Sequence, residues 1–487
     1  MSNYATENLR TLALVGHGSC GKTTLIEAML YRAGMIPEMG SIQRGTTMCD
    51  NDLLEKEVGH SIRLAVAHID TAMTDLTPVR IHILDTPGYP DYLGQDMSAL
   101  DAVKSVCAVI DPTKGPELLT RRLMAMAKER GLCRMIVINH MDDPEADLEK
   151  CLRELQETWG PGVLPINLPT RNRTHVIDCF DREDGDSDIM TVDDVHRAFI
   201  ERVVEEDDEM LERYLEEGSI DPRALHPLVT KALREGHVIP VCFCSAKKLI
   251  GIRDFMKVII RHLPSPAEAN DALFIKRDGT PFKTYPDKNL PLIAQVFKIV
   301  NDPFIGKIGI FRVHQGTLKK DDVIYVDDNK RAIKAPRPLI LQGKHTQETD
   351  FLSPGDIGAI AKVDEVNYET EGKDRHQSLL RQVAGCVHQH DAFVTLAQTG
   401  KKLPDVIGIF DVERLYGIRQ TYPSIFLYIL LSFGVNGLLS VKIHNEYAFS
   451  LCRQVIGKHS AERSLTDTAL LIGKGEHDIV SHCRSCY

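Results

Sequence analysis

Short apolar runs, each followed by small or polar residues, mark the first half of the chain. Runs of this length between turn residues predict buried β-strands. The spacing of Leu25, Ala28 and Met29 predicts a helix after the first run. The predicted strands cover 12–15, 79–85, 134–138 and 237–244, and the helix covers 24–31. Strands separated by helical segments are typical of α/β proteins, so we expect residues 1–266 to form one domain around a central, mostly parallel sheet.

The pattern changes near residue 291. Residues 267–290 are rich in Asp, Lys, Pro and Gly and predict a linker. Short segments of alternating polarity follow, separated by turn residues, as is typical of antiparallel strands. These segments are 293–300, 308–313, 322–326 and 357–363. We therefore expect a small β-barrel over 291–366.

Residues 165–237 separate the third and fourth predicted strands and predict an inserted subdomain. The insertion contains a strand-like stretch at 175–178. It also contains an acidic segment at 202–217, which we predict to be one helix with a narrow apolar side. A run of acidic residues of this kind is typical of a solvated helix face.

The tail from 367 to 487 lacks clear periodicity, and we expect poor order there. It resembles either a truncated copy that ends in out-of-frame sequence or a separate C-terminal module. Its apolar stretch at 424–439 is short for a membrane span, so we predict no span. A zinc site needs four well-spaced ligands, which the tail does not offer, so we predict no metal there. The candidate ligands are Cys483, Cys486, His388 and His390.

The first predicted strand leads into a glycine-rich loop that ends in a lysine. The eight residues from Gly16 to Thr23 read GHGSCGKT and fit the pattern GxxxxGK[ST] between a strand and a helix. Glycines let backbone N–H groups turn toward phosphate oxygens, and the helix N-terminus adds partial positive charge. Lys22 would reach the β- and γ-phosphates and the Thr23 hydroxyl would bind Mg²⁺, whereas the alternative is a glycine turn with an incidental lysine. The expected phosphate-binding residues are Gly16, His17, Gly18, Ser19, Cys20, Gly21, Lys22, Thr23 and Thr24.

Polar residues also follow the other three predicted strands. Asp85 and Gly88 form Asp-x-x-Gly, a pattern in which the carboxylate holds Mg²⁺ through a water and the glycine N–H reaches a γ-phosphate. Asn139 and Asp142 form Asn-x-x-Asp, whose carboxylate suits the two N–H donors of guanine that adenine lacks. Each pattern alone is also explained by a turn, but all of them follow strands, where open α/β sheets bind ligands. The fourth strand adds Ser245, Ala246 and Lys247 beside the expected base.

Composition narrows the classes of protein. Apolar residues make up 43% and charged residues 26% of the chain, which fits a globular protein. The net charge of −11 argues against broad electrostatic capture of nucleic acid. The twelve cysteines are scattered through apolar segments and the N-terminus lacks a signal-peptide pattern, so we expect a reducing, cytoplasmic location.

Together these motifs resemble the translational GTPases of the elongation factor G family, and they are most similar to its elongation factor G-like (type 2) branch. The resemblance covers roughly residues 8 to 366 and then stops, so the chain resembles a family member truncated after its second domain. Beyond the nucleotide motifs it rests on the segments LPINLP at 164–169, LPSP at 263–266, KIVNDPFIGK at 298–307, GTL at 316–318 and PGDI at 354–357.

The resemblance implies GTP or GDP and Mg²⁺ as ligands. Thr23, Ser61 and Asp85 are the expected metal ligands, with Ser61 at the position of a family threonine. His140 stands where the family has a lysine beside the purine. The resemblance also implies a ribosomal partner, both rRNA and ribosomal proteins, with the inserted subdomain facing a stalk protein. We expect no DNA, no membrane partner and a monomer.

Tyr89 marks the largest departure from the family, which has a histidine there to orient the attacking water. A phenol is a poorer partner for water at neutral pH. The expected catalytic residues are Lys22, Gly88 and Tyr89. We therefore hypothesise a GTPase whose intrinsic hydrolysis is slow and depends on an activating partner. The alternatives are a GTP-dependent binding module with little hydrolysis and a P-loop kinase or ATPase, which the Asn-x-x-Asp pattern argues against.

Overall fold

The computed structural model describes residues 4–72, 77–218, 220, 222–271, 274–276, 280–302, 305–326 and 332–362, together with five short strands beyond them. The chain divides into two compact units, Met1–Ala384 and Gly385–Tyr487. The first unit contains both predicted domains.

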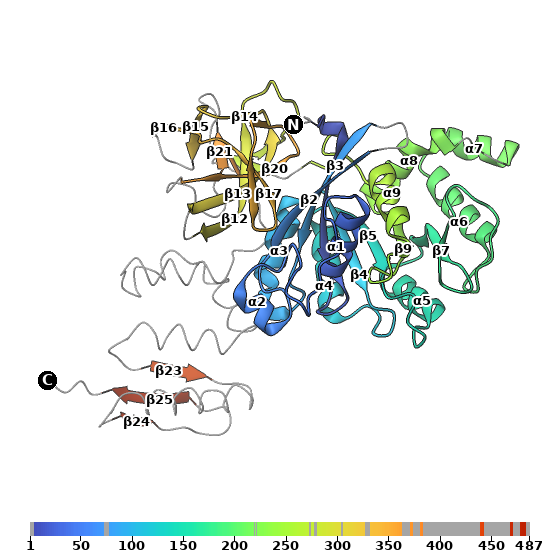
Figure 1. Ribbon diagram of the computed structural model, residues 1–487, viewed down its shortest axis with the longest axis horizontal. Helices are drawn as coiled ribbons and strands as arrows, with labels where there is room; N and C mark the ends of the chain where they lie inside the picture. Colours follow the sequence, from blue (N-terminus) through green and yellow to red (C-terminus); the bar gives the residue numbers. More distant parts are fainter. Residues whose placement is uncertain are drawn as a thin grey trace. The chain divides into compact units, whose positions relative to one another are not determined.

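A seven-stranded sheet forms the centre of the first half of the chain (Figure 1). Its strand order is β2 (Ala65–Ala72), β3 (Pro78–Asp85), β1 (Leu9–Val15), β4 (Ser105–Ile110), β5 (Cys133–Ile138), β9 (Ile239–Phe243) and β6 (Val163–Pro165). All neighbouring pairs are parallel except β2 with β3. Every residue of β1, β4, β5 and β9 is buried, which explains their continuous apolar runs. The predicted α/β class is confirmed.

Helices cover both faces of this sheet. The alternate residues Leu12 and Leu14 of β1 belong to a core with α1 (Lys22–Arg32), α6 (Val192–Val204), α8 (Pro222–Glu235) and α9 (Ile252–His262). Ala13 and Val15 point to the opposite face and belong to a core with α3 (Leu93–Ala102), α4 (Leu118–Glu129) and α5 (Leu148–Trp159). Successive strand residues thus bury their side chains in two separate layers. The cysteines at 107, 133, 242 and 244 lie in this sheet region, buried and unpaired.

The insertion differs from its predicted form in one respect. A strand, β8 (Val176–Asp178), does form where one was expected, and it pairs with β7 (Asn167–Pro169). The single helix predicted over 202–217 is wrong, because the segment divides between α6 and α7 (Asp208–Glu217). The Asp207 carboxylate causes the division, since it accepts from the Met210 N–H and so begins a new helix. No residue of α7 is buried, as expected for a solvated acidic face.

Antiparallel strands make up the second half of the first unit. The sheet order is β16 (Ala332–Lys334), β15 (Val323–Val326), β21 (Glu371–Lys373), β12 (Ile293–Asp302), β13 (Gly306–Gln315), β20 (Ile357–Ala361), β17 (Leu339–Gln342) and β18 (His345–Glu348). A further pair joins β14 (Leu318–Lys319) to β19 (Phe351–Leu352). This all-antiparallel domain, drawn yellow to orange in Figure 1, confirms the expected antiparallel strands, whereas their closure into a small β-barrel stays a prediction.

Short strands lie in two segments where none was expected. The predicted linker contains β10 (Phe274–Lys276) and β11 (Pro281–Phe282). The predicted tail contributes β22 (Leu380–Gln382), which pairs with β10, and β21, which pairs with β12. Strands of two or three residues are too short to show an alternating pattern, which is why the sequence did not indicate them.

The antiparallel domain packs against the helical layer that contains α3. Phe297, Ile308 and Ile310 share a core with Ala99 and Leu100 of that helix. At the edge of this contact, the Lys298 ammonium donates to the carbonyl of Leu64. The His68 ring bonds the Leu341 carbonyl at 2.9 Å, and the Gly343 N–H donates to the Val66 carbonyl at 2.9 Å. The segment leading into β2 is therefore bonded directly to the second domain.

The second unit contains one described sheet of three antiparallel strands. Their order is β23 (Leu439–Lys442), β25 (Asp478–Cys483) and β24 (Thr468–Leu470). Cys483 ends β25, whereas Cys486, His388, His390 and nearly all of the apolar stretch at 424–439 lie outside the described residues. Within the part of the chain that is described, no helix is long and apolar enough to cross a membrane.

We predict that Asp207→Ala loosens α7 while leaving the rest of the fold intact. The cap contributes about 1 kcal/mol, and α7 has no buried residue to compensate for its loss. Amide hydrogen exchange in α7 should accelerate by roughly fivefold. Glu216→Ala, which changes an exposed residue of the same helix, is the control and should leave exchange near the parent rate. Equal exchange in parent and Asp207→Ala would show that the helix does not depend on its cap.

Candidate functional site

The loop between β1 and α1 has a shape that only glycine permits at two positions. Gly16 has a φ of +147°, and a Cβ there would lie 2.5 Å from the Val109 carbonyl oxygen of β4. Gly21 has a φ of +92°, and a Cβ there would lie 2.3 Å from Nδ2 of Asn139. Gly21 is also the N-cap of α1, where no side chain caps the helix. The first N–H groups of α1 are therefore available to an anion.

Lys22 lies across this loop and is buried. Its ammonium donates to the carbonyls of Gly16 and His17, each at 2.9 Å. Gly88, which has a φ of +86°, lies directly beside it, since a Cβ on Gly88 would come within 2.3 Å of the Lys22 Nζ. His17 lies at the rim of the loop, with Nδ1 2.8 Å from the Glu117 carboxylate. The structure thus brings Lys22 and Gly88 together, although they lie on different strand ends.

A cluster of buried oxygen groups lies next to the lysine. The Thr23 hydroxyl donates to Oδ2 of Asp85 at 2.7 Å and lies 3.2 Å from the Ser61 hydroxyl. The Ser61 hydroxyl in turn donates to Oδ1 of Asp50 at 2.7 Å. The second carboxylate oxygen of Asp85, Oδ1, is buried and has no hydrogen-bond partner among the described residues. Burial, and then the charge of Asp50, raises the pKa of Asp85 to about 7. A cation at this cluster would give Oδ1 of Asp85 a partner and would stabilise the ionised form of that carboxylate.

Two further buried carboxylates hold the loop that carries Ser61. Glu27 of α1 accepts from the N–H groups of Gly40 and Met48, at 2.9 and 2.5 Å. Glu55 of α2 (Leu53–Val58) accepts from the N–H groups of Ile62 and Arg63, at 3.0 and 2.9 Å. Sequence analysis did not identify Glu27, Asp50 or Glu55. The irregular loop that they organise has no period, so only the strand or helix on either side of it could have been predicted.

The residues expected at the base converge on the other side of the loop. Asn139 donates from Nδ2 to the Cys20 carbonyl at 3.0 Å and accepts from the Ala246 N–H at 2.9 Å. It therefore ties the phosphate loop to the segment after β9. His140 lies over the end of the loop, because a Cβ on Gly21 would lie 3.2 Å from its Nε2. His140 has a φ of +57°, and its Nδ1 lies 3.6 Å from the Asp111 carboxylate.

Asp142 lies beside these groups and is partly exposed. Burial acts to raise its pKa, but hydrogen bonds from Ser245 and Lys248 outweigh burial and hold the pKa below its usual value. The Lys248 ammonium is 2.9 Å from Oδ2 of Asp142. Lys247, which the sequence places beside the base, is exposed like Lys248, and its role at the base stays a prediction. The carboxylate of Asp142 is thus ionised at neutral pH and ready to accept from N–H donors.

Tyr89 covers the phosphate loop. A Cβ on Gly18 would lie 2.4 Å from the Cζ atom of the phenol ring, so the ring packs directly on that glycine. The ring also contacts the His60 ring, with centroids 4.5 Å apart and planes tilted by 42°. Tyr89 precedes η2 (Pro90–Tyr92) and is half-buried. Thr24, in the first turn of α1, is half-buried as well.

Comparisons with known proteins agree with this geometry. The family model for the elongation factor Tu GTP binding domain matches residues 7–265, more than half of the chain. A second family model, for elongation factor G domain 2, matches residues 291–369. The chain belongs to the elongation factor G type of translational GTPases. This confirms the resemblance drawn from the motifs and the strand-rich second domain.

Individual relatives are similar over the same region. An elongation factor G-like protein of Mycobacterium tuberculosis is 29% identical over 388 residues, which cover 73% of this chain and 53% of the relative. Elongation factor G of Fervidobacterium nodosum is 29% identical over 374 residues, with 72% and 53% covered. A crystal structure of a Thermus thermophilus protein has a TM-score of 0.65 and 28% identity, and the match covers 77% of this chain and 55% of that one. This elongation factor G-type chain thus spans about half the length of the curated relatives that it matches.

Asp96 of α3 is a further buried acid that sequence analysis missed. It is fully buried, and neither of its carboxylate oxygens accepts a hydrogen bond from the described residues. The hydroxyl of Thr86 lies near the Asp96 carboxylate, but it donates its hydrogen bond to the Leu14 carbonyl at 2.9 Å. Burial raises the pKa of Asp96 to about 6, against the smaller opposing effects of Thr86 and Lys22.

We predict that Asp96→Asn stabilises the nucleotide-free protein above pH 6. The folded state holds a proton on Asp96 more tightly than the unfolded state, so the parent loses stability as the pH rises from about 4 to about 6. A shift of this size corresponds to a loss on the order of 3 kcal/mol. Urea unfolding at pH 4 and pH 8 should show a smaller loss for Asp96→Asn than for the parent. Asp91→Asn, at an exposed position nearby, is the control. If Asp96→Asn and the parent lost stability equally between the two pH values, burial would not destabilise the ionised form of Asp96.

Proposed function

We propose that this chain binds GTP with Mg²⁺ at the carboxyl ends of its parallel strands and hydrolyses it slowly as a translation factor. One observation carries the proposal. Lys22, Thr23, Asp85, Asn139 and Ala246 come from four separate strand ends, yet hydrogen bonds link them through a single glycine-rich loop. A triphosphate and a purine could then bind one continuous crevice, as in other α/β nucleotide sites.

The oxygen cluster fits a divalent cation. Hydroxyl and carboxylate oxygens are the ligands that Mg²⁺ prefers, and the unpartnered buried oxygen of Asp85 provides a place for positive charge. Thr23 and Asp85 would hold the ion, with Ser61 completing the set when the loop closes. Mg²⁺ supplies charge stabilisation to the phosphates when bound. Lys22, already placed over the loop by two carbonyls, would move its three N–H donors onto phosphate oxygens.

The other side of the crevice would select the base. An ionised Asp142 accepts from two parallel N–H donors, and guanine offers such a pair through N1 and its exocyclic amine. Adenine offers no matching pair, and the carboxylate would lose its partners there. His140 would cover one face of the purine. The segment that contains the buried backbone N–H of Ala246 would lie beside the guanine carbonyl.

Tyr89 would lie nearest the attacking water. Its phenol group packs on Gly18 and His60 at the entrance to the phosphate loop, next to Gly88. A phenol can orient a water by a hydrogen bond but cannot accept its proton readily at neutral pH. The residues Lys22 and Gly88 would bind the transferred phosphate, so charge stabilisation rather than general base catalysis would supply most of the rate.

We propose the ribosome as the partner. This rests on the family relationship and not on a contact seen in the chain. The family names of its relatives are those of translation factors. A second candidate is a GTP-dependent binding module with little hydrolysis. The packing of Tyr89 in place of a basic side chain favours this binding module. The rate of GTP turnover in the presence of ribosomes distinguishes it from the GTPase.

We predict that Asp142→Asn weakens GTP binding by about 2 kcal/mol, or roughly thirtyfold, because it removes a charged acceptor for two donors. Displacement of a fluorescent GTP analogue measures the effect, and ATP should fail to displace it from the parent. Asp143→Asn is the matched control, since its carboxylate caps a turn by accepting from the Glu145 N–H. An unchanged GTP affinity in Asp142→Asn, or equal displacement by ATP and GTP, would contradict the assignment of the base site.

Single-turnover GTP cleavage should be slow for the free protein and should accelerate when ribosomes are added. We predict that Tyr89→Phe lowers the accelerated rate by about tenfold while leaving GTP affinity unchanged, because only the hydroxyl is lost. Tyr92→Phe, on the neighbouring turn, should behave as the parent. If ribosomes failed to accelerate cleavage although GTP bound tightly, the binding-module candidate would replace the GTPase.

A further inference from the structure

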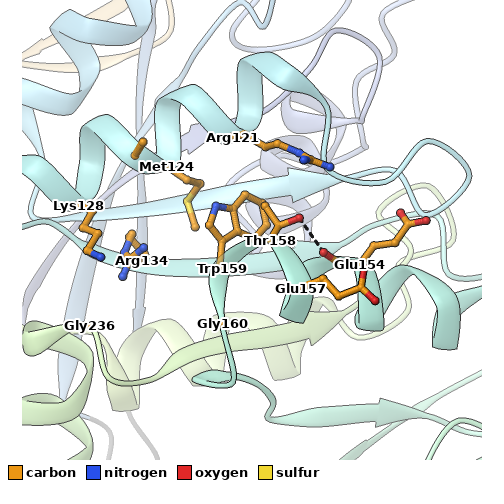
Figure 2. Close-up of a pocket in the computed structure, with 11 residues that line it drawn as sticks. Arg121, Met124, Lys128, Arg134, Glu154, Glu157, Thr158, Trp159, Gly160 and Gly236 are labelled. Atoms are coloured by element: carbon orange, nitrogen blue, oxygen red, sulfur yellow. Dashed lines mark hydrogen bonds between the residues drawn. The ribbon is translucent and has the colours of Figure 1, made fainter.

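A second pocket lies away from the nucleotide crevice, between α4, β5 and α5. Its volume is about 760 Å³, within the range of small-molecule sites. None of the residues that line it belongs to the crevice described above. Figure 2 shows the side chains of α4, β5 and α5 that line the pocket.

The floor of the pocket contains a buried, unpaired arginine. Arg134 of β5 is only 7% exposed. Within the described residues, no carboxylate or other acceptor lies within bonding distance of its guanidinium. Gly236 leaves room for it, since a Cβ there would lie 3.0 Å from Nη2 of Arg134. Its guanidinium nitrogens nevertheless reach the solvent in the pocket, where a ligand anion could accept their N–H groups.

A second cation lies at the same end of the pocket. Lys128 of α4 is exposed, and its ammonium forms no ion pair with any residue that the structure describes. In the view of Figure 2, Lys128 and Arg134 lie together at one end, whereas Glu154 and Glu157 of α5 lie at the other. One end of the pocket is therefore basic, with two charges that no acidic side chain in the described part of the chain balances.

A flat apolar wall adjoins the basic end. Trp159, the last residue of α5 and the single tryptophan of the chain, faces the pocket beside Met124 (Figure 2). An indole presents a broad face on which a planar ring can stack, as bases do on aromatic side chains in nucleic-acid complexes. The pocket thus combines an anion-binding end with a stacking surface.

We propose that this pocket binds a small phosphate monoester that carries a planar ring, of the chemical class of a nucleoside monophosphate. A phosphate monoester carries a charge of about −1.5 to −2 at pH 7, which matches the two unpaired cations better than the single charge of a carboxylate. Arg134 binds the phosphate through its fork of N–H donors, Lys128 neutralises the remaining charge, and Trp159 stacks on the ring. This site does not depend on the proposed function of the nucleotide crevice.

The single tryptophan allows a direct test. Fluorescence of Trp159, excited at wavelengths where adenine does not absorb, is followed while adenosine 5′-monophosphate is added to the full chain in the presence of excess GDP and Mg²⁺. Saturable quenching is expected, because the adenine ring stacks on the indole. Adenosine and inorganic phosphate should each bind at least about tenfold more weakly than the monophosphate, since each lacks one of the two contacts.

Variants separate this site from the nucleotide crevice. Arg134→Gln should weaken binding of adenosine 5′-monophosphate by at least about tenfold and Lys128→Gln by several fold. Arg122→Gln, an exposed arginine of the same helix outside the pocket, should have no effect. Lys128→Gln alters an exposed position, so its effect does not depend on how well Arg134→Gln folds. The proposal is overturned if the monophosphate causes no saturable change in fluorescence, or if adenosine or phosphate alone binds as tightly. It is also overturned if benzoate, a planar ring that carries a carboxylate in place of a phosphate, binds more tightly than the monophosphate. Binding like the parent in both Arg134→Gln and Lys128→Gln would overturn it as well.

Discussion

The hydrogen bond between the Thr23 hydroxyl and the Asp85 carboxylate is the contact on which the site depends. It joins the start of α1 to the end of β3 in the interior of the protein, where water cannot compete for either group. Because parallel strands end at the same edge of the sheet, the same junction also brings in Lys22, Gly88 and the loop that carries Ser61. A buried carboxylate with one satisfied and one unsatisfied oxygen is poorly stable by itself, so this cluster holds a charge that its own described residues do not fully compensate.

The central sheet and the polar residues at its strand ends could be predicted from the sequence. Buried parallel strands are apolar throughout, and the residues that end them are spaced in recognisable patterns, so Lys22, Asp85, Asn139 and Asp142 were identified before their contacts were known. The loop between α1 and β2 could not be predicted in the same way. Its shape depends on Glu27 and Glu55, two carboxylates that accept from backbone N–H groups outside their own helices and that resemble ordinary helix-surface acids in the sequence.

The differences elsewhere have similar physical origins. The acidic segment at 202–217 has continuous helical spacing, and only the cap formed by Asp207 divides it. Strands β10, β21 and β22 are very short, and each pairs with a segment that is distant in the sequence, so local pattern carries no information about them. At the base end, the ion pair of Asp142 is formed by Lys248, which lies one residue beyond the strand-end pattern and was therefore not marked by it.

The bond from Lys298 to the Leu64 carbonyl has a thermodynamic consequence. Leu64 follows Ser61 closely in the chain, and the Gly343 and Leu341 backbone groups hold the adjoining strand β2, so the antiparallel domain is attached to the same loop that would close on a nucleotide. Linkage requires such a coupling to act in both directions and with equal strength. Suppose that a bound nucleotide favours one orientation of the antiparallel domain by a certain factor. Docking on a large assembly that fixes this orientation would then raise the affinity for the nucleotide by the same factor.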